Sequence, residues 1–130
     1  MGTGTMQVKT NVWIEKDGQV VLSRWRIALL QAVQETGSIS AAAQRMGIPY
    51  HRAWDKIHEC EERLGFALLA TQTGGLGGGG ARLTPEGANY VSRFLQFNQG
   101  LDRLIGERFA EAFGDLAAPW NDDKTQPPGG

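Results

Sequence analysis

The stretch that most constrains this chain runs from residue 37 to residue 64, with the sequence GSISAAAQRMGIPYHRAWDKIHECEERL. Ser38 can cap the start of a helix there, and Gly47 supplies the backbone freedom needed just past a helix end. Between them, apolar side chains recur at i, i+3, i+4 and i+7, which predicts a short helix with one apolar side. These side chains are Ile39, Ala42, Ala43 and Met46.

A second, longer helix is predicted directly after the break at residues 47–49. Pro49 lacks an N–H and has a fixed φ, so it suits the first turn of this helix. The apolar residues on one side are Ala53, Ile57, Cys60 and Leu64. The polar residues around the other side are His51, Arg52, Asp55, Lys56 and Glu59. Two helices joined by a short turn, the second with a free polar face, are typical of the helix-turn-helix, whose second helix reads DNA.

The residues before this motif predict a hairpin and a core helix. Residues 8–14 and 19–22 are β-prone, and a turn at Lys16-Asp17-Gly18 separates them. Ser23 is a suitable cap for a helix over residues 24–36, which Gly37 ends. The apolar side chains of that helix cover so much of its surface that we expect it to lie at the centre of the core.

The residues after the motif predict a β-wing and a long helix. Residues 66–71 and 81–83 are strand-like, and a glycine-rich loop, TGGLGGGG, separates them at residues 73–80. Glycines let the backbone N–H groups of such a loop approach a phosphate closely. Thr84 and Pro85 are a strong helix start, and we expect this helix to run to about Phe113.

The long helix predicts a dimer. Its apolar side chains follow spacings of 4, 3, 4 and 3: Tyr90, Phe94, Phe97, Leu101 and Leu104. A helix of roughly 29 residues spans on the order of 43 Å, longer than a small winged core can cover. Pairing with a second copy would present two recognition helices to DNA half-sites about 34 Å apart or a multiple of that. The alternative is that the stripe packs wholly within one chain.

Composition limits the other classes of protein. The 130 residues fit one domain, and the formal net charge of −1 argues against a nucleic-acid binder, although phosphates respond only to the local patch. The single cysteine, Cys60, excludes an internal disulfide and is expected to be a buried thiol. No run of 18 apolar residues and no signal sequence is present, so we expect a soluble cytoplasmic protein with no membrane contact.

Beyond these patterns, the sequence resembles the N-terminal DNA-binding domain of ModE-type molybdate-dependent transcriptional regulators, over about residues 8–113. The matching residues are 37–40 (GSIS), 53–57 (AWDKI), 73–75 (TGG), 77–80 (GGGG) and 83–84 (LT). A looser similarity to LysR-type winged domains covers only the helix-turn-helix. The resemblance implies no cofactor in this chain, because the family's molybdate sites lie in C-terminal domains for which no residues remain. Either the chain acts as a stand-alone DNA-binding member, or a separate effector-sensing protein supplies the ligand.

The family pattern and helical geometry together give a set of candidate DNA contacts. On the second helix of the motif these are Tyr50, His51, Arg52, Asp55 and Lys56, of which Arg52 can donate two hydrogen bonds to guanine. Asp55 either accepts from a cytosine or, as we prefer, orients Arg52 or Lys56. The preceding helix, which crosses the DNA backbone in this motif, offers Ser38, Ser40 and Gln44, with Ser38 equally suited to a cap alone. The wing offers Gly77, Gly78, Gly79 and Arg82, the alternative being an inert loop. For Trp54 we favour core packing over DNA contact.

Three other functions have weaker support in the sequence. Residues 75–80 match G-x-G-x-x-G, but no βαβ unit surrounds them, so nucleotide binding is not expected. His51 and His58 lack a third ligand at metal spacing, and no catalytic arrangement is evident, so we expect neither a metal site nor an enzyme. The near-neutral charge leaves a protein-docking module as the alternative function.

The sequence therefore predicts a mainly α fold with a small β wing, a winged helix-turn-helix with a long C-terminal dimerisation helix. The expected divisions are a disordered N-terminus at 1–7, the winged domain at 8–84, the dimerisation helix at 85–114 and a flexible tail at 115–130. The expected partners are palindromic double-stranded DNA and a second copy of the chain.

Overall fold

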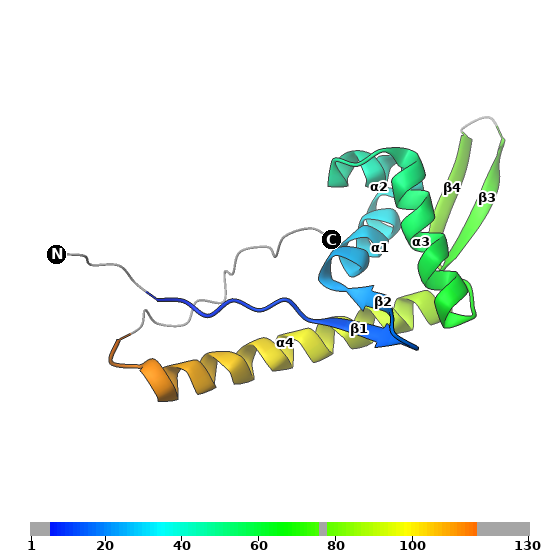
Figure 1. The fold of residues 1–130 in the computed structure, drawn as a ribbon. Helices are drawn as coiled ribbons and strands as arrows, with labels where there is room; N and C mark the ends of the chain where they lie inside the picture. Colours follow the sequence, from blue (N-terminus) through cyan, green and yellow to red (C-terminus); the bar gives the residue numbers. More distant parts are fainter. Residues whose placement is uncertain (1–5, 76–77, 117–130) are drawn as a thin grey trace.

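A computed structural model of the chain describes residues 6–75 and 78–116. Figure 1 shows the shorter helices gathered at one end of a much longer one, with one hairpin next to the long helix and the other projecting away from it. Along the chain the elements are β1 (Trp13–Lys16), β2 (Gln19–Ser23), α1 (Arg24–Thr36), α2 (Ile39–Met46), α3 (Tyr50–Leu64), β3 (Leu69–Gly75), β4 (Gly78–Leu83) and α4 (Pro85–Phe113). The predicted mainly α class with a small β wing is confirmed.

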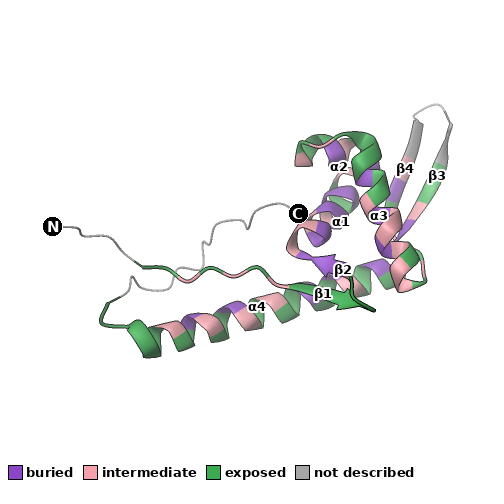
Figure 2. Cartoon of the chain, viewed as in Figure 1, coloured by how far each residue is buried: buried purple, intermediate pink, exposed green. Residues whose placement is uncertain are grey.

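The α1 helix lies at the centre of the core, as its broad apolar surface predicts. It packs against α2, α3, α4, β2 and β4. Its side chains at Ile27, Leu29, Leu30 and Val33 are at most 2% exposed. Figure 2 shows this buried material concentrated where α1, α2 and α3 meet. At roughly 1.5–3 kcal/mol for each fully buried aliphatic side chain, this centre is the main source of the free energy that seats the other helices.

The helix ends of the helix-turn-helix follow local sequence rules. The hydroxyls of Ser23 and Ser38 accept hydrogen bonds from the backbone N–H groups of Arg26 and Ala41, which caps α1 and α2. Both helices end at glycines with positive φ, 85° at Gly37 and 72° at Gly47. Pro49 departs from the prediction: it precedes the first turn of α3 with an extended backbone, because a residue at the cap position lies just outside the helix.

The first hairpin is shorter than its β-prone sequence predicts. β1 begins at Trp13, and residues 8–12 form no strand, because the partner β2 contains only five residues. The turn at Asp17 and Gly18 is confirmed, with a positive φ at both positions. Lys16 lies in β1, not in the turn.

The second hairpin corrects the prediction of a loop over residues 73–80. β3 starts at Leu69, later than the predicted residue 66, and continues to Gly75, while β4 already begins at Gly78. The N–H of Ala81 donates to the carbonyl oxygen of Gly37 at 2.8 Å, and a Cβ at Gly80 would lie 3.3 Å from that oxygen. Glycine therefore lets β4 approach the end of α1, a tertiary contact that strand propensity does not register. We call this hairpin the β3–β4 wing.

The start of α4 is fixed by a close approach to the residues before β3. Thr84 caps the helix, and its hydroxyl also donates to the carbonyl oxygen of Ala67 at 2.8 Å. A Cβ at Gly87 would lie only 2.2 Å from the carbonyl oxygen of Leu68, so the backbones can meet there only at a glycine. The predicted helix over residues 85–113 is confirmed.

Arg24 ties the far half of α4 to the rest of the molecule. Its guanidinium donates to Asp102 Oδ1 and Asn98 Oδ1, both at 2.9 Å, and to the carbonyl oxygen of Thr10 at 2.8 Å. Figure 1 shows the N-terminal segment running beside α4. Because the side chains of Arg24 and Asp102 are only 14% and 10% exposed, this pair fixes where α4 lies relative to α1.

The apolar stripe of α4 divides between two environments, which corrects part of the dimer prediction. Phe94 is 2% exposed and belongs to the core of its own chain, so it is no free dimer contact. Tyr90 is half-buried, with its ring 5.1 Å from that of Phe66. Leu101 is half-buried, whereas Phe97 and Leu104 are each 46% exposed. The helix turns its stripe away from the core as it leaves the bundle, so only the later residues remain available to a partner.

Candidate nucleic-acid interface

The α3 helix has one buried side, a solvent-facing side opposite it, and two flanks between them. Ala53, Ile57 and Cys60 are at most 3% exposed and seat the helix on the core. The side chains of His51, Asp55 and Glu62 project opposite them into solvent. One flank carries Arg52, Lys56 and Arg63, and the other carries Tyr50, Trp54 and His58. The predicted surface for α3 is therefore uncovered by the described part of its own chain.

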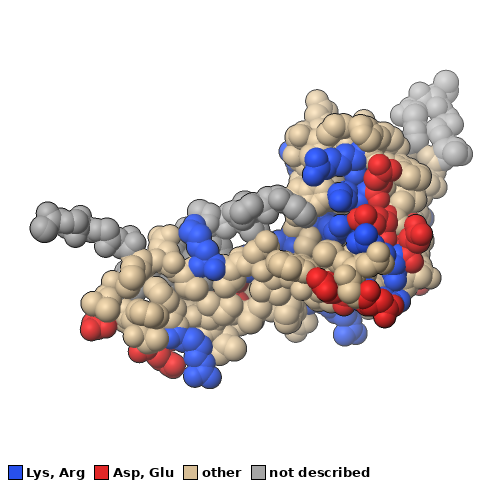
Figure 3. Space-filling view, viewed as in Figure 1, with Lys and Arg blue, Asp and Glu red and all other residues tan. Residues whose placement is uncertain are grey.

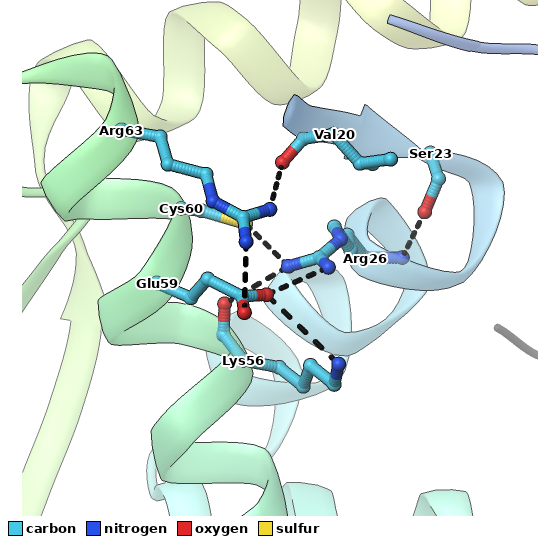
Figure 4. A network of polar contacts seen from close by, with 7 residues as sticks. All are labelled: Val20, Ser23, Arg26, Lys56, Glu59, Cys60 and Arg63. Carbon is cyan, nitrogen blue, oxygen red and sulfur yellow. Dashed lines mark hydrogen bonds and ion pairs between the residues drawn. The ribbon is translucent and has the colours of Figure 1, made fainter. Parts of the chain in front are cut away.

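The basic flank of α3 is organised by Glu59, whose carboxylate faces three cations. Glu59 Oε2 lies 2.8 Å from Arg26 Nη2 and 3.9 Å from Lys56 Nζ, while Oε1 lies 3.1 Å from Arg63 Nη2. Arg26 also donates to the carbonyl oxygen of Lys56 at 3.3 Å. Figure 4 shows Arg26 reaching from α1 to the middle of α3, with Glu59 between Arg26, Lys56 and Arg63. This network holds the flank at a fixed rotation relative to the core.

The ionisation of the network follows from its burial and charge. Burial alone would raise the pKa of Glu59, but the hydrogen bond and charge of Arg26, with Lys56 and Arg63, lower it overall. Burial would lower the pKa of Arg26, but at the high pH at which a guanidinium titrates, the charge of the Cys60 thiolate and the hydrogen bond and charge of Glu59 raise it overall. Burial raises the pKa of the Cys60 thiol against the pull of Arg26, so the thiol stays neutral. Cys60 is the buried core thiol that its helical position predicts.

The remaining predicted contacts lie on α2 and the β3–β4 wing. Ser40 and Gln44 are exposed on one side of α2, one helical turn apart, whereas the hydroxyl of Ser38 is used in the cap. Arg82 is exposed on β4, next to the buried Ala81. Gly78 pairs with Gly75 across the wing, and Gly79 follows it in β4. Gly77 lies outside the described residues.

Charged side chains mark this end of the molecule. Figure 3 shows Lys and Arg gathered over α2 and α3, with acidic side chains beside them, and a smaller group of both signs on α4. Together α2 and α3 carry four cations and four carboxylates, namely Arg45, Arg52, Lys56 and Arg63 and Asp55, Glu59, Glu61 and Glu62, so this surface is near neutral in sum, like the whole chain. Phosphates respond to charges within about 10 Å or less, so the arrangement of these side chains, and not their sum, determines which of them attract DNA.

Trp54 and Asp55 both project from α3 into solvent. Trp54 is 42% exposed, so the favoured core role is wrong; the seam of Ala53 and Ile57 points elsewhere on the helix. Asp55 makes no hydrogen bond or ion pair within residues 6–75 and 78–116, and Lys56 approaches Glu59 instead. The orienting role of Asp55 remains a prediction for a DNA-bound state.

Sequence reasoning overlooked the polar residues that hold α3 in place. Arg26 interrupts the buried face of α1, where it is only 7% exposed, and a cation there requires an acidic partner. That anomaly was the available signal for Glu59. Glu61 gave no signal: its Oε2 accepts from the N–H groups of Leu68 and Leu69 at 2.8 and 3.1 Å and ties α3 to the start of β3.

No group of three or more potential metal ligands occurs among residues 6–75 and 78–116, and no helix in those ranges is long and apolar enough to cross a membrane.

Comparison with known sequences places residues 25–88 among bacterial regulatory helix-turn-helix proteins of the lysR family. The DNA-binding transcriptional dual regulator ModE of Escherichia coli is 38% identical over 96 residues, which are 74% of this chain and 35% of that protein. The molybdenum-pterin-binding protein MopB of Rhodobacter capsulatus is 39% identical over 80 residues, 62% of this chain and 30% of that protein. The chain thus spans about a third of the length of the curated relatives it matches.

Solved structures show the same fold. The DNA-binding domain of BenM, in complex with benA site 1 DNA, superposes with a TM-score of 0.52 at 25% identity, covering 68% of this chain and 94% of that one. Full-length CbnR in complex with its target DNA superposes with a TM-score of 0.54 at 24% identity, covering 69% of this chain and 30% of that one. The similarity to CbnR supports the fold alone.

Proposed function

We propose, from the match of residues 25–88 to the lysR family of bacterial regulatory helix-turn-helix proteins and from the homology to ModE transcriptional regulators, that the chain regulates transcription by binding palindromic DNA as a homodimer. The ModE relatives of Yersinia pestis and Escherichia coli are transcriptional regulators, and no enzymatic step is part of this proposal. Since transcription regulators act on chromosomal DNA, we place the chain in the cytoplasm.

The observation that carries the proposal is the asymmetry of α3. One side is held on the core by Ala53, Ile57 and Cys60, and the basic flank is fixed by Glu59. The opposite side, with His51 and Asp55, and the flank with Tyr50 at 52% exposure have no covering from the described part of the chain. A rigidly seated helix with an uncovered polar side is what insertion into a major groove requires.

Each neighbouring element has a role in this proposal. Arg52 is suited to guanine, and Lys56 and His51 to a base or a phosphate. Ser40 and Gln44 on α2 would contact the backbone of the duplex, as the first helix of this motif does. Arg82, with Gly78 and Gly79, would approach a phosphate or the minor groove from the β3–β4 wing.

The dimer rests on the exposed part of α4. Phe97 and Leu104 are seven residues apart, two helical turns, and so lie on one side of the helix. The occupant we propose is the same helix of a second copy, because a two-fold pair places two identical α3 helices on one side of the duplex. A separate effector-sensing protein remains a candidate partner of this assembly.

The test is selection of bound sequences from a random DNA pool, followed by affinity measurements on the winner between about 50 and 200 mM salt. We expect an inverted repeat and a steep fall of affinity with salt, since each neutralised phosphate releases counterions. Enrichment of no sequence, with affinity insensitive to salt, would instead favour a protein-docking module.

A further inference from the structure

Trp54 is a large apolar side chain on α3 that has no role in the function proposed above. It is 42% exposed, one turn after Tyr50 and one turn before His58. These three residues form what we call the aromatic flank of α3. A large exposed apolar side chain on the helix that is proposed to enter the major groove is a candidate contact to the bases.

The indole of Trp54 is held in place. The imidazole of His58 stacks on it with ring centroids 3.6 Å apart and an interplanar angle of 18°. His58 Nδ1 lies 2.8 Å from the carbonyl oxygen of Trp54, an acceptor, so this nitrogen donates. The stack and the hydrogen bond together restrict both rings.

The stack is linked to the start of β3 through Glu61. His58 Nε2 lies 3.8 Å from Glu61 Oε1, an ion pair when the imidazole is protonated. Glu61 in turn is bound by the N–H groups of Leu68 and Leu69 through its other oxygen. A continuous series of contacts therefore runs from the start of β3 through Glu61 and His58 to Trp54.

Fixing an exposed aromatic side chain costs conformational entropy when the chain folds. Because the side chain is already fixed, that entropy is not lost again when a partner binds, and the affinity is higher. The major groove offers one apolar group on its floor, the C5-methyl group of thymine. An indole has a single N–H donor and no charge, so it suits that methyl group better than a phosphate.

We propose that Trp54 is a specificity-determining residue that packs against a thymine methyl group in each half-site, with His58 as its positioning residue. This inference rests on the proposed DNA binding. It adds a thymine at a definite place in the site to the polar contacts expected of Arg52 and Lys56.

The test uses the unaltered protein and the selected DNA site, in which each thymine is replaced in turn by deoxyuridine. Deoxyuridine lacks only the methyl group and keeps the Watson–Crick and groove hydrogen bonds. We expect the affinity to fall about three- to fivefold at one symmetry-related position and to change little at the others.

Substitutions in the protein test whether Trp54 is the residue that contacts the methyl group. Trp54→Ala should bind the thymine and deoxyuridine sites equally at that position and retain any response elsewhere. Leu95→Ala, which truncates an equally exposed side chain on α4 (41%), should discriminate like the parent chain. His58→Ala should weaken the discrimination without changing the salt slope, and His58→Phe, which keeps a stacking ring, should restore it.

The possible failures are distinguishable. Equal binding of the thymine and deoxyuridine sites at every position, or discrimination that persists in Trp54→Ala, overturns the role of Trp54 and leaves DNA binding intact. A chain that binds no DNA overturns both proposals. Because the deoxyuridine arm needs no substitution, the inference is tested even if a Trp54 variant folds poorly.

Discussion

The guanidinium of Arg26 on α1 and the carboxylate of Glu59 on α3 lie 2.8 Å apart, and this ion pair sets how α3 is rotated on the core. Arg26 is 7% exposed, so the free-energy cost of burying its charge must be offset by the groups around it. The same carboxylate faces Lys56, a candidate DNA contact. Glu59 therefore contacts both the residue that holds α3 on the core, Arg26, and a residue that is proposed to contact DNA, Lys56.

Replacing Glu59 should destabilise the fold. Glu59→Gln leaves the buried Arg26 without its anion, and we expect a loss of about 1–3 kcal/mol in the free energy of unfolding. Urea denaturation measures this directly. Glu62→Gln, at an exposed position three residues along α3, removes the same charge and should cost less than about 0.5 kcal/mol. Equal effects of the two would contradict a structural role for the pair.

Acid should remove the contribution of Glu59. The folded protein lowers the pKa of this carboxyl below its ordinary value of 4.5, so it binds protons less readily than the unfolded chain. Its stabilisation is therefore complete above pH 4.5 and disappears as the pH falls through the lowered pKa. Unfolding of the parent chain and Glu59→Gln between pH 7 and pH 3 should show their difference shrinking with acid. A difference that grows instead would reverse the sign of the shift.

Two glycines of α4 should respond oppositely to alanine. At Gly87 a methyl group would meet the carbonyl oxygen of Leu68 at 2.2 Å, so Gly87→Ala forces the backbones apart and should cost about 1–3 kcal/mol. At Gly100 nothing lies within 4 Å of the added Cβ, and Gly100→Ala should gain up to about 1 kcal/mol from helix propensity. Thermal or urea unfolding decides. Stabilisation by both substitutions would show that the close approach at Gly87 is absent.

Truncating the basic flank should weaken DNA binding. Arg52→Ala and Lys56→Ala should each reduce the affinity for the selected site by ~1–3 kcal/mol, because each removes a base or phosphate contact. Arg103→Ala changes the charge equally at an exposed position on α4 and serves as the control. Gel-shift titration measures all three. Unchanged affinity in both α3 variants would remove this helix from the mechanism.

The proposed dimer should depend on one side of α4. Phe97→Glu and Leu104→Glu place charges at the proposed interface and should shift the chain to monomers, since a buried unpaired charge costs several kcal/mol. Leu95 is similarly exposed, at 41%, but lies on another side of the helix, so Leu95→Glu should leave the oligomeric state unchanged. Sedimentation equilibrium reports the mass. A monomeric parent chain at all concentrations would contradict the proposal.

Much of the fold could be predicted because its boundaries depend on neighbouring residues. The caps at Ser23 and Ser38 and the left-handed glycines at 37 and 47 fix α1 and α2 to the residue. The burial of Cys60 followed from helical spacing alone. The polyglycine segment was misassigned because its strand pairing depends on the partner strand and on Gly37, more than 40 residues away in the sequence.

Where the helices begin and end, and which side of each is apolar, could be predicted from the residues alone, because caps and periodicity act over a few residues. Three outcomes became visible in the folded chain: Trp54 stays exposed against His58, Phe94 is buried in the core of its own chain, and Arg26 reaches Glu59. Those outcomes depend on how the helices are rotated against one another. That rotation is set by contacts between side chains distant in the chain, which no local pattern records.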